Sequence, residues 1–218
     1  MEKVVSTTHL DLNAVAQCHC KAFPHALATA LGRRHVRRML SWYLSTQSAF
    51  LFHVEDEAGR CIGYCGGIVS DGSLDTGSSS GMAQHSFWSA IWGFITHPWV
   101  LFHPEVRKKW PLLRKNILMK LGVRRKHFSP AQKQKMAQNP HVGLVVIGVA
   151  PEFHGKGYGS MLLKEFERRA VEDYGIYQLG LSVLATNHKA IRAYERNGWV
   201  KGKLQGESLQ MKKEVAKM

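Results

Sequence analysis

The chain has 218 residues, of which 44% are hydrophobic and 21% are charged, and its formal net charge is +14. This length and composition allow one domain with a buried core and exclude a wholly disordered chain. The positive charge is local, because positions 105–135 hold 11 Lys and Arg against one acid, Glu105, and so supply +10 of the total. A uniformly basic surface is therefore excluded as well.

The chain start and the cysteines indicate the compartment. The first residues contain no apolar stretch of signal-peptide length, and the nearly uncharged run 72–104 is interrupted by polar residues. Neither export nor a transmembrane helix is predicted, so we expect a cytoplasmic protein. The cysteines form a C-x-C and a C-x-x-x-C pair, which differ from the usual zinc-binding spacing: Cys18, Cys20, Cys61 and Cys65. We expect reduced thiols and no metal site.

The N-terminal part predicts two helices. The first begins around Thr8 and ends at Phe23-Pro24, and its apolar face is formed by Leu10, Ala14, Val15 and Cys18. The second is expected over 26–44. One of its faces is apolar, and the other is basic and carries Arg33, Arg34, Arg37 and Arg38.

A hairpin and an insertion follow. The strand-like runs 49–55 and 61–69 flank the turn residues 56–59, which predicts an antiparallel pair. The composition then changes over 71–140, which we interpret as an insertion of helices broken at Pro98, Pro104 and Pro111. A Ser/Gly/Asp loop opens it at 71–81, and aromatic and basic residues dominate its central part, 82–128.

Three interpretations of the segment 82–128 stay open. It forms a lid over an acceptor site, with some basic residues neutralising ligand phosphates. Alternatively, it contacts an anionic membrane from the inner face, since aromatic residues beside Lys and Arg suit phospholipid headgroups. The third interpretation, nucleic-acid binding, is the least favoured, because it needs aromatic and basic residues along one shared groove.

The last third of the chain predicts alternating strands and helices. A continuously apolar run, 144–149, is typical of a strand covered on both faces. A helix over 157–174 follows, with Met161, Leu162, Phe166 and Ala170 on its apolar face. Next come a strand over 176–184, a helix over 187–197, and a final strand pair that begins at Trp199. This order is an α/β arrangement.

Three glycines recur at every second residue between the apolar strand and the helix after it: Gly155, Gly157 and Gly159. Glycine lets a ligand approach the main chain, and the first turn of a helix offers unpaired N–H groups to an anion. A P-loop is excluded because Lys156 is followed by Gly157 rather than by Ser or Thr. A dinucleotide fingerprint is excluded because the third glycine comes one residue early. The loop therefore predicts a different pyrophosphate site.

Two segments resemble the GNAT superfamily of acyl-CoA N-acyltransferases. Positions 149–163 (VAPEFHGKGYGSMLL) resemble its cofactor motif, and positions 181–199 (LSVLATNHKAIRAYERNGW) resemble its second motif. The resemblance implies one GNAT-like α/β domain over 1–218, with a mixed, mostly antiparallel central sheet flanked by helices and the insertion 71–140. Phe23-Pro24, Leu31-Gly32 and the basic insertion further resemble a bacterial subgroup found with surface-polysaccharide genes.

The resemblance also implies acetyl-CoA, or another acyl-CoA, as co-substrate. Its pantetheine arm would lie where the strand ending at Val149 splays from 181–184, and backbone groups of Ile147, Gly148 and Val149 would bind it. The Val149 amide is the expected oxyanion donor. Asn187 would contact the pantetheine or cap its helix. The pyrophosphate would lie on the loop formed by His154, Gly155, Lys156, Gly157, Tyr158, Gly159 and Ser160.

The implied reaction is acetyl transfer to a primary amine of a small acceptor, for example an amino sugar. Tyr194 stands where the family places a general acid, and its alternative is a packed aromatic. Relatives often use a Glu as base where this chain has Gly143. His141, His85 or a water chain are the remaining candidates for the base. The alternative function is a catalytically silent CoA-binding module that uses a membrane or nucleic-acid surface.

Overall fold

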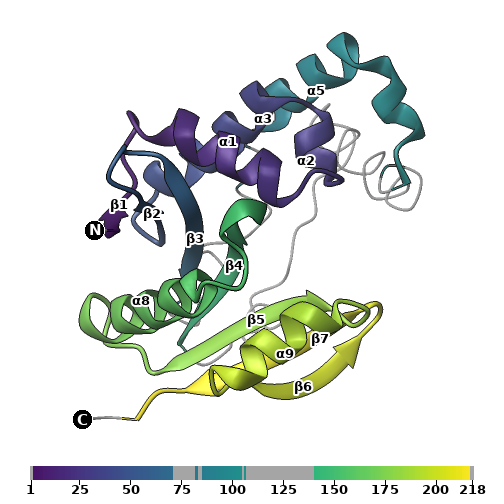
Figure 1. Ribbon diagram of the computed structural model, residues 1–218. Helices are drawn as coiled ribbons and strands as arrows, with labels where there is room; N and C mark the ends of the chain where they lie inside the picture. The colour runs from purple at the N-terminus through teal and green to yellow at the C-terminus, as the bar shows by residue number, and fades with distance from the viewer. Residues whose placement is uncertain (1, 71–81, 83–84, 105, 107–139, 217–218) are drawn as a thin grey trace, which may run out of the picture.

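The computed structural model describes residues 2–70, 82, 85–104, 106 and 140–216 (Figure 1). The described strands form one seven-stranded sheet in the order β1-β2-β3-β4-β5-β7-β6. Their bounds are β1 Lys3–Ser6, β2 Ala49–Glu55, β3 Cys61–Ser70, β4 His141–Val149, β5 Gln178–Leu184, β6 Val200–Gln205 and β7 Ser208–Glu214. All neighbouring strands are antiparallel except β4 and β5. This confirms the mixed, mostly antiparallel sheet.

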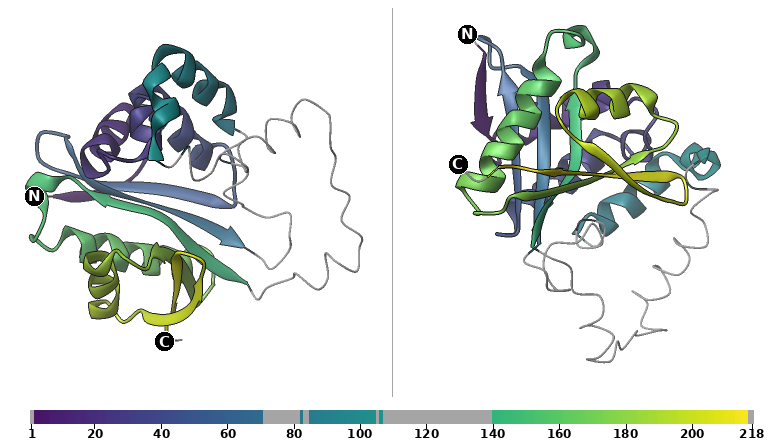
Figure 2. Two further views of the ribbon diagram at one scale, coloured as in Figure 1. Left: turned by 90° about the vertical axis from the view of Figure 1, so that its right-hand side faces the viewer. Right: turned by 90° about the horizontal axis from the view of Figure 1, so that it is seen from below.

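Helices cover both faces of this sheet, as the two views of Figure 2 show. One face carries α1 (Leu12–Ala22), α2 (Leu27–Ala30), α3 (Arg33–Leu40) and the 3-10 helix η1 (Ser41–Leu44). The opposite face carries α8 (Tyr158–Glu172) and α9 (His188–Arg196). A short 3-10 turn, η3 (Pro151–Phe153), connects β4 to the glycine loop. The predicted hairpin, the glycine loop and the strands and helices after it are confirmed within two residues.

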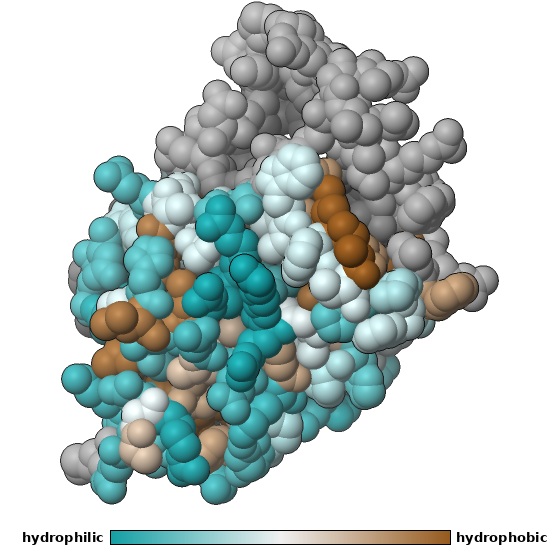
Figure 3. Space-filling model, turned by 90° about the horizontal axis from the view of Figure 1, so that it is seen from above, coloured by the Kyte–Doolittle hydropathy of each residue, from teal (hydrophilic) through white to brown (hydrophobic). Residues whose placement is uncertain are grey.

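Only part of the predicted insertion lies among the described residues. It contains α5 (Phe87–Thr96) and the 3-10 helix η2 (Pro98–Phe102), so the break at Pro98 is confirmed. The loop 71–81, Pro111 and most of the basic run lie outside the described residues. Helix α5 packs beside α3 at the top of the molecule, which Figure 3 views from above. No described helix has the length and hydropathy needed to span a bilayer.

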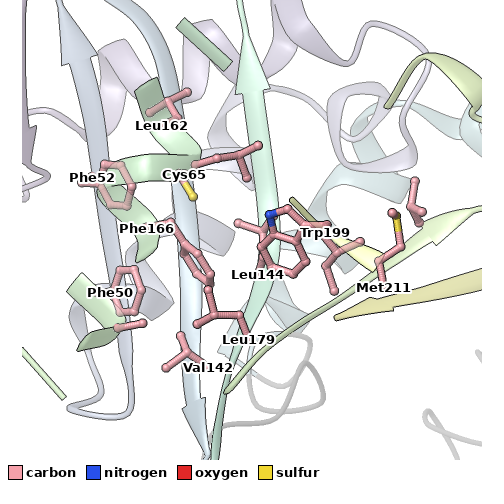
Figure 4. Close-up of a cluster of buried hydrophobic side chains, with 14 of the residues drawn as sticks. Phe50, Phe52, Cys65, Val142, Leu144, Leu162, Phe166, Leu179, Trp199 and Met211 are labelled. Atoms are coloured by element: carbon pink, nitrogen blue, oxygen red, sulfur yellow. The ribbon is translucent and has the colours of Figure 1, made fainter. Parts of the chain in front are cut away.

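The core consists of two main layers, one on each face of the sheet. On the α8 face, Phe50 and Phe52 of β2 and Cys65 of β3 pack against Phe166 of α8 (Figure 4). On the α1 face, Tyr64 of β3 joins residues of α1, α3 and η1. Because both faces are covered, β2 and β3 are buried at consecutive positions. The run 144–149 was expected to be covered in the same way, but only Leu144 and Gly148 are buried in it and Val145 is 41% exposed.

Three details of the predicted elements are wrong. The helix expected over 26–44 is interrupted at Gly32, whose φ of +95° lies outside the helical region. Leu10 was expected in the core but is 90% exposed, because it lies in the turn before α1, where Asp11 Oδ2 accepts the Thr8 N–H at 2.8 Å. Met161 is 38% exposed, since it lies in the first turn of α8. The four-residue strand β1 was not predicted.

Candidate functional site

The parallel strands β4 and β5 separate after three paired positions. Their pairing runs from Val142 with Leu179 to Leu144 with Leu181 and then stops, although β4 continues to Val149. On its other side, β4 carries an extra residue, because Gly66 of β3 pairs with Val146 and Gly67 pairs with Leu144. Such a bulge bends the strand that contains it. The edge of β4 from Val145 to Val149 therefore lacks a strand partner on the β5 side, and the predicted splay is confirmed.

The backbone of this free edge points into the gap. The Ala150 N–H donates to the Ile62 carbonyl of β3 at 2.9 Å. Because successive residues of a strand turn their N–H and C=O groups to opposite sides, Val149 and Ile147 turn theirs away from β3. The contact between His154 Nε2 and the Val149 carbonyl oxygen, at 2.9 Å, agrees with this orientation. The N–H groups of Ile147 and Val149 thus face the gap, as a thioester and pantetheine arm would need.

The glycine loop presents unpaired amides directly beside this edge. Gly155 and Gly157 have φ values of +78° and +88°, and a Cβ added at Gly155, Gly157 or Gly159 would meet no atom within 4 Å. Among the described residues, no acceptor pairs with the backbone N–H groups from Gly155 to Ser160. The last three of these begin α8, whose dipole favours an anion. The loop therefore fits a pyrophosphate on its main chain.

The side chains of the same loop have other partners. The Lys156 ammonium lies 5.3 Å from the centre of the Phe153 ring, and the Tyr158 hydroxyl donates to Glu2 Oε1 at 2.6 Å. Ser160 Oγ accepts from Asn197 Nδ2 at 3.1 Å, which joins the start of α8 to the end of α9. The fit to a pyrophosphate thus rests on the main chain, and cofactor contacts of these side chains stay predictions.

Asn187 caps α9. Its Oδ1 accepts the Ala190 N–H at 3.1 Å, so the structure shows the capping alternative. This bond places no demand on the Nδ2 group, and a contact of Asn187 with the pantetheine arm stays a prediction.

Tyr194 is half-buried on α9, with its ring 6.1 Å from that of Trp199. Burial, with a smaller contribution from Cys65, raises the pKa of the Tyr194 phenol to about 12. Tyr194 packs against the core layer on the α8 face, which includes Cys65, the register partner of Ile147. The hydroxyl stays protonated at neutral pH, as a proton donor must. Its role as general acid stays a prediction.

The structure does not bring the candidate bases to Val149. His141 begins β4 and lies eight residues before Val149, or roughly 26 Å along the strand at about 3.3 Å per residue. Gly143 pairs with Gly180, and the His141 ring lies 3.9 Å from the position of a Cβ on Gly180. His85 Nε2 is 3.2 Å from Ser41 Oγ, on the helices above the sheet. The base therefore stays open.

A buried polar pair behind β4 was missed in the sequence. His19 Nδ1 of α1 contacts the Tyr64 hydroxyl of β3, and the Tyr64 ring closes on Gly148, where a Cβ would lie 3.0 Å from it. Burial, with His35 as a second cause, lowers the pKa of His19 to about 4. The two residues are 45 positions apart, so no local pattern indicates the contact. Within the described residues, no group of three His, Cys, Asp or Glu side chains is arranged to hold a metal ion.

Comparison with known proteins agrees with this geometry. The family model described as "Acetyltransferase (GNAT) family" matches residues 124–199, which include the glycine loop and the second motif. No curated protein gives a significant match to the whole sequence.

Solved acetyltransferases share the fold at low sequence identity. PaiA N-acetyltransferase from Thermoplasma acidophilum, in complex with coenzyme A, is 12% identical over 99% of both chains, with a TM-score of 0.56. The ribosomal-protein-S18-alanine N-acetyltransferase from Escherichia coli is 14% identical over 100% of this chain and 96% of its own, with a TM-score of 0.53. An aminoglycoside 6'-N-acetyltransferase from Acinetobacter baumannii is 10% identical over 94% and 95%, with a TM-score of 0.54.

The free edge of β4 and the open loop give the geometry that a thioester cofactor with a pyrophosphate would need. Residues 124–199 match the GNAT acetyltransferase family model, and the chain shares the fold of solved N-acetyltransferases.

Proposed function

We propose that this chain transfers an acetyl group from acetyl-CoA to a primary amine of a small acceptor, for example an amino sugar. The observation that carries the proposal is the set of unpaired amides from Gly155 to Ser160 beside the free edge of β4. A diphosphate on these amides would let a pantetheine arm run along β4 toward Val149. Acetyl-CoA supplies an activated acetyl group, as a thioester, to this position.

The residues of the chain then have distinct tasks. The Val149 N–H donates to the carbonyl oxygen as negative charge develops there, a contribution of about 3 kcal/mol in comparable sites. Tyr194 gives its proton to the sulfur as the C–S bond breaks and the C–N bond forms. The proton that the amine loses goes to a water chain that leads to solvent, since His141 and His85 both lie away from Val149. Tyr194 recovers its proton from solvent before the next turnover.

The chemical class of the acceptor is less closely defined than the acetyl donor. Two structurally similar enzymes are named for a ribosomal-protein alanine and for an aminoglycoside as acceptors, so the fold alone does not select between a peptide and a sugar. An amino sugar carried on a lipid would suit the predicted surface-polysaccharide subgroup. It would also suit a cytoplasmic protein whose segment 82–128 contacts the inner face of a membrane. None of the comparisons bears on this subgroup.

Two measurements test the proposed function. Calorimetric titration of the purified protein with coenzyme A should give saturable heat. An absence of heat and saturation would refute the site itself. Release of free thiol from acetyl-CoA is then followed with a panel of amines. Steady turnover with any amine excludes the catalytically silent module, whereas tight acetyl-CoA binding without turnover across the panel supports that module.

A further inference from the structure

Helix α3 presents a cluster of exposed arginines. Arg33, Arg34, Arg37 and Arg38 are all exposed, and the described part of the chain offers none of them an ion-pair partner. These arginines line three surface hollows, and Arg34 borders all three. Four exposed positive charges on one short helix make a strong local potential, which an anionic partner would neutralise.

The neighbouring helix α5 presents apolar side chains to solvent. Its inner face packs against Leu31 and Val100. Its outer face carries Trp88, Trp92 and Ile95, whose spacing of four and three residues places them on one stripe. Trp88 is 74% exposed and Ile95 is 66% exposed. Trp99 and Phe102 of η2 extend this exposure, and α5 contains no charged residue.

The two features form one continuous surface. Helices α3 and α5 are in contact, and a groove of about 650 Å³ lies between them, with Leu31 and Trp92 on its walls and Arg33 and Arg34 at its rim. Figure 3 shows strongly hydrophilic side chains beside pale and hydrophobic ones on this side of the molecule. We define the arginine–tryptophan surface as Arg33, Arg34, Arg37 and Arg38 together with Trp88, Trp92, Ile95, Trp99 and Phe102.

We propose that the arginine–tryptophan surface binds an anionic phospholipid membrane. Tryptophan is enriched where lipid headgroups meet the hydrocarbon layer, and arginine pairs with phosphate. Each basic residue near an anionic bilayer strengthens binding by about fivefold. With ten residues, α5 is about 15 Å long and suits a position in the plane of the interface rather than across the bilayer.

Membrane binding explains both halves of the surface at once. A nucleic acid would use the arginines and the tryptophan rings but would leave the aliphatic Ile95 without a role. The proposal extends the contact predicted for 82–128 to α3, and it does not depend on acetyl transfer. Figure 1 places α3 and α5 at the opposite end of the molecule from β6 and β7, so these strands offer a control surface.

Vesicle co-sedimentation tests the proposal with the full chain. The parent should bind vesicles that contain phosphatidylglycerol, bind pure phosphatidylcholine much less, and lose binding in high salt. The double variant Arg34→Glu/Arg37→Glu should bind anionic vesicles at least about 25-fold less, at about fivefold per arginine. A matched control, Lys203→Glu/Lys212→Glu, makes the same change of charge on β6 and β7 and should bind like the parent.

A second variant tests the apolar half. Trp88→Ser/Ile95→Ser should weaken binding to the same vesicles, and the tryptophan emission of the parent should shift to shorter wavelength when vesicles are added. Coenzyme A titration of each variant confirms that it is folded, independently of vesicle binding. The proposal is overturned if the parent protein does not bind anionic vesicles, or if the arginine variant binds them as strongly as the parent does. It is also overturned if the parent binds single-stranded RNA but no vesicle.

Discussion

Replacing Gly157 by alanine separates backbone strain from ligand binding. Gly157 has a φ of +88°, a conformation that costs an L-residue roughly 1–2 kcal/mol. Added atoms would meet no protein group within 4 Å, so strain is the only expected cost to the free protein. The Tm should fall by about 2–8 °C, from roughly 2–4 °C per kcal/mol for a chain of this size.

The loss of coenzyme A affinity should be larger than this strain implies. Gly157 lies at the centre of the open amides, and the added methyl group would project into the space where a pyrophosphate would approach. A hydrogen bond to a charged group contributes about 1.5–3 kcal/mol, so losing one such bond weakens binding about 10- to 150-fold. Titration calorimetry measures the Kd, and thermal unfolding without ligand measures the strain.

Gly59→Ala is the matched control for this experiment. Gly59 has a φ of +71°, also with no atom within 4 Å of an added Cβ, but it lies in the turn between β2 and β3. The control should lose a similar Tm and keep its coenzyme A affinity. The reasoning is refuted if Gly157→Ala binds coenzyme A as tightly as the parent, or if both variants lose affinity equally.

Three other changes test separate parts of the site and fold. Tyr194→Phe should lower thiol release by about 100-fold or more with an unchanged Kd for coenzyme A, and equal turnover would exclude the general-acid role. Asn187→Ala should cost about 1 kcal/mol in urea unfolding through loss of the α9 cap, whereas Asn187→Asp should retain it, and two equally destabilised variants would argue against capping. Burial lowers the pKa values of His19 and His35 to about 4, so the unfolded chain binds more protons below pH 6.5. Stability should therefore be complete above pH 6.5 and fall toward pH 4, by up to about 3 kcal/mol per histidine. His35→Gln should flatten the unfolding free energy over this range, and an unchanged slope would count against the assignment.

The elements that the sequence predicted correctly are those whose pattern is formed by residues close together in the chain. The apolar run of β4, the glycines and the amphipathic α8 follow each other within thirty residues or so, and each has a local chemical signature. The interruption at Gly32 was missed because a single glycine is tolerated within a helical pattern. The short strand β1 was missed because it is defined only by its pairing with β2, about fifty positions away.

The parts of the site that sequence could not predict depend on tertiary contacts. The motif indicates that Val149 and the loop bind a cofactor, but the direction of the Val149 amide follows from the pairing of Ala150 with Ile62. The distance between His141 and Val149 follows from strand geometry once β4 is known to include both. The contact of His19 with Tyr64 joins elements far apart in the chain and needs the folded core.

The gap between β4 and β5 lies beside tightly packed glycines of the neighbouring strand β3. At Gly67, an added Cβ would lie 2.4 Å from Phe50 and 2.9 Å from Phe166, so the close approach of these two rings requires glycine there. At Gly66, on the opposite face, the Tyr43 ring requires glycine in the same way. The ladder with β4 shifts register between these two glycines, and the extra residue on β4 is Val145. Parallel pairing with β5 ends one residue before it, at Leu144. Large aromatic side chains thus pack on both faces of β3 at the point where β4 carries its bulge and its edge becomes free. We infer that the position of the Ile147 and Val149 N–H groups depends on this packing.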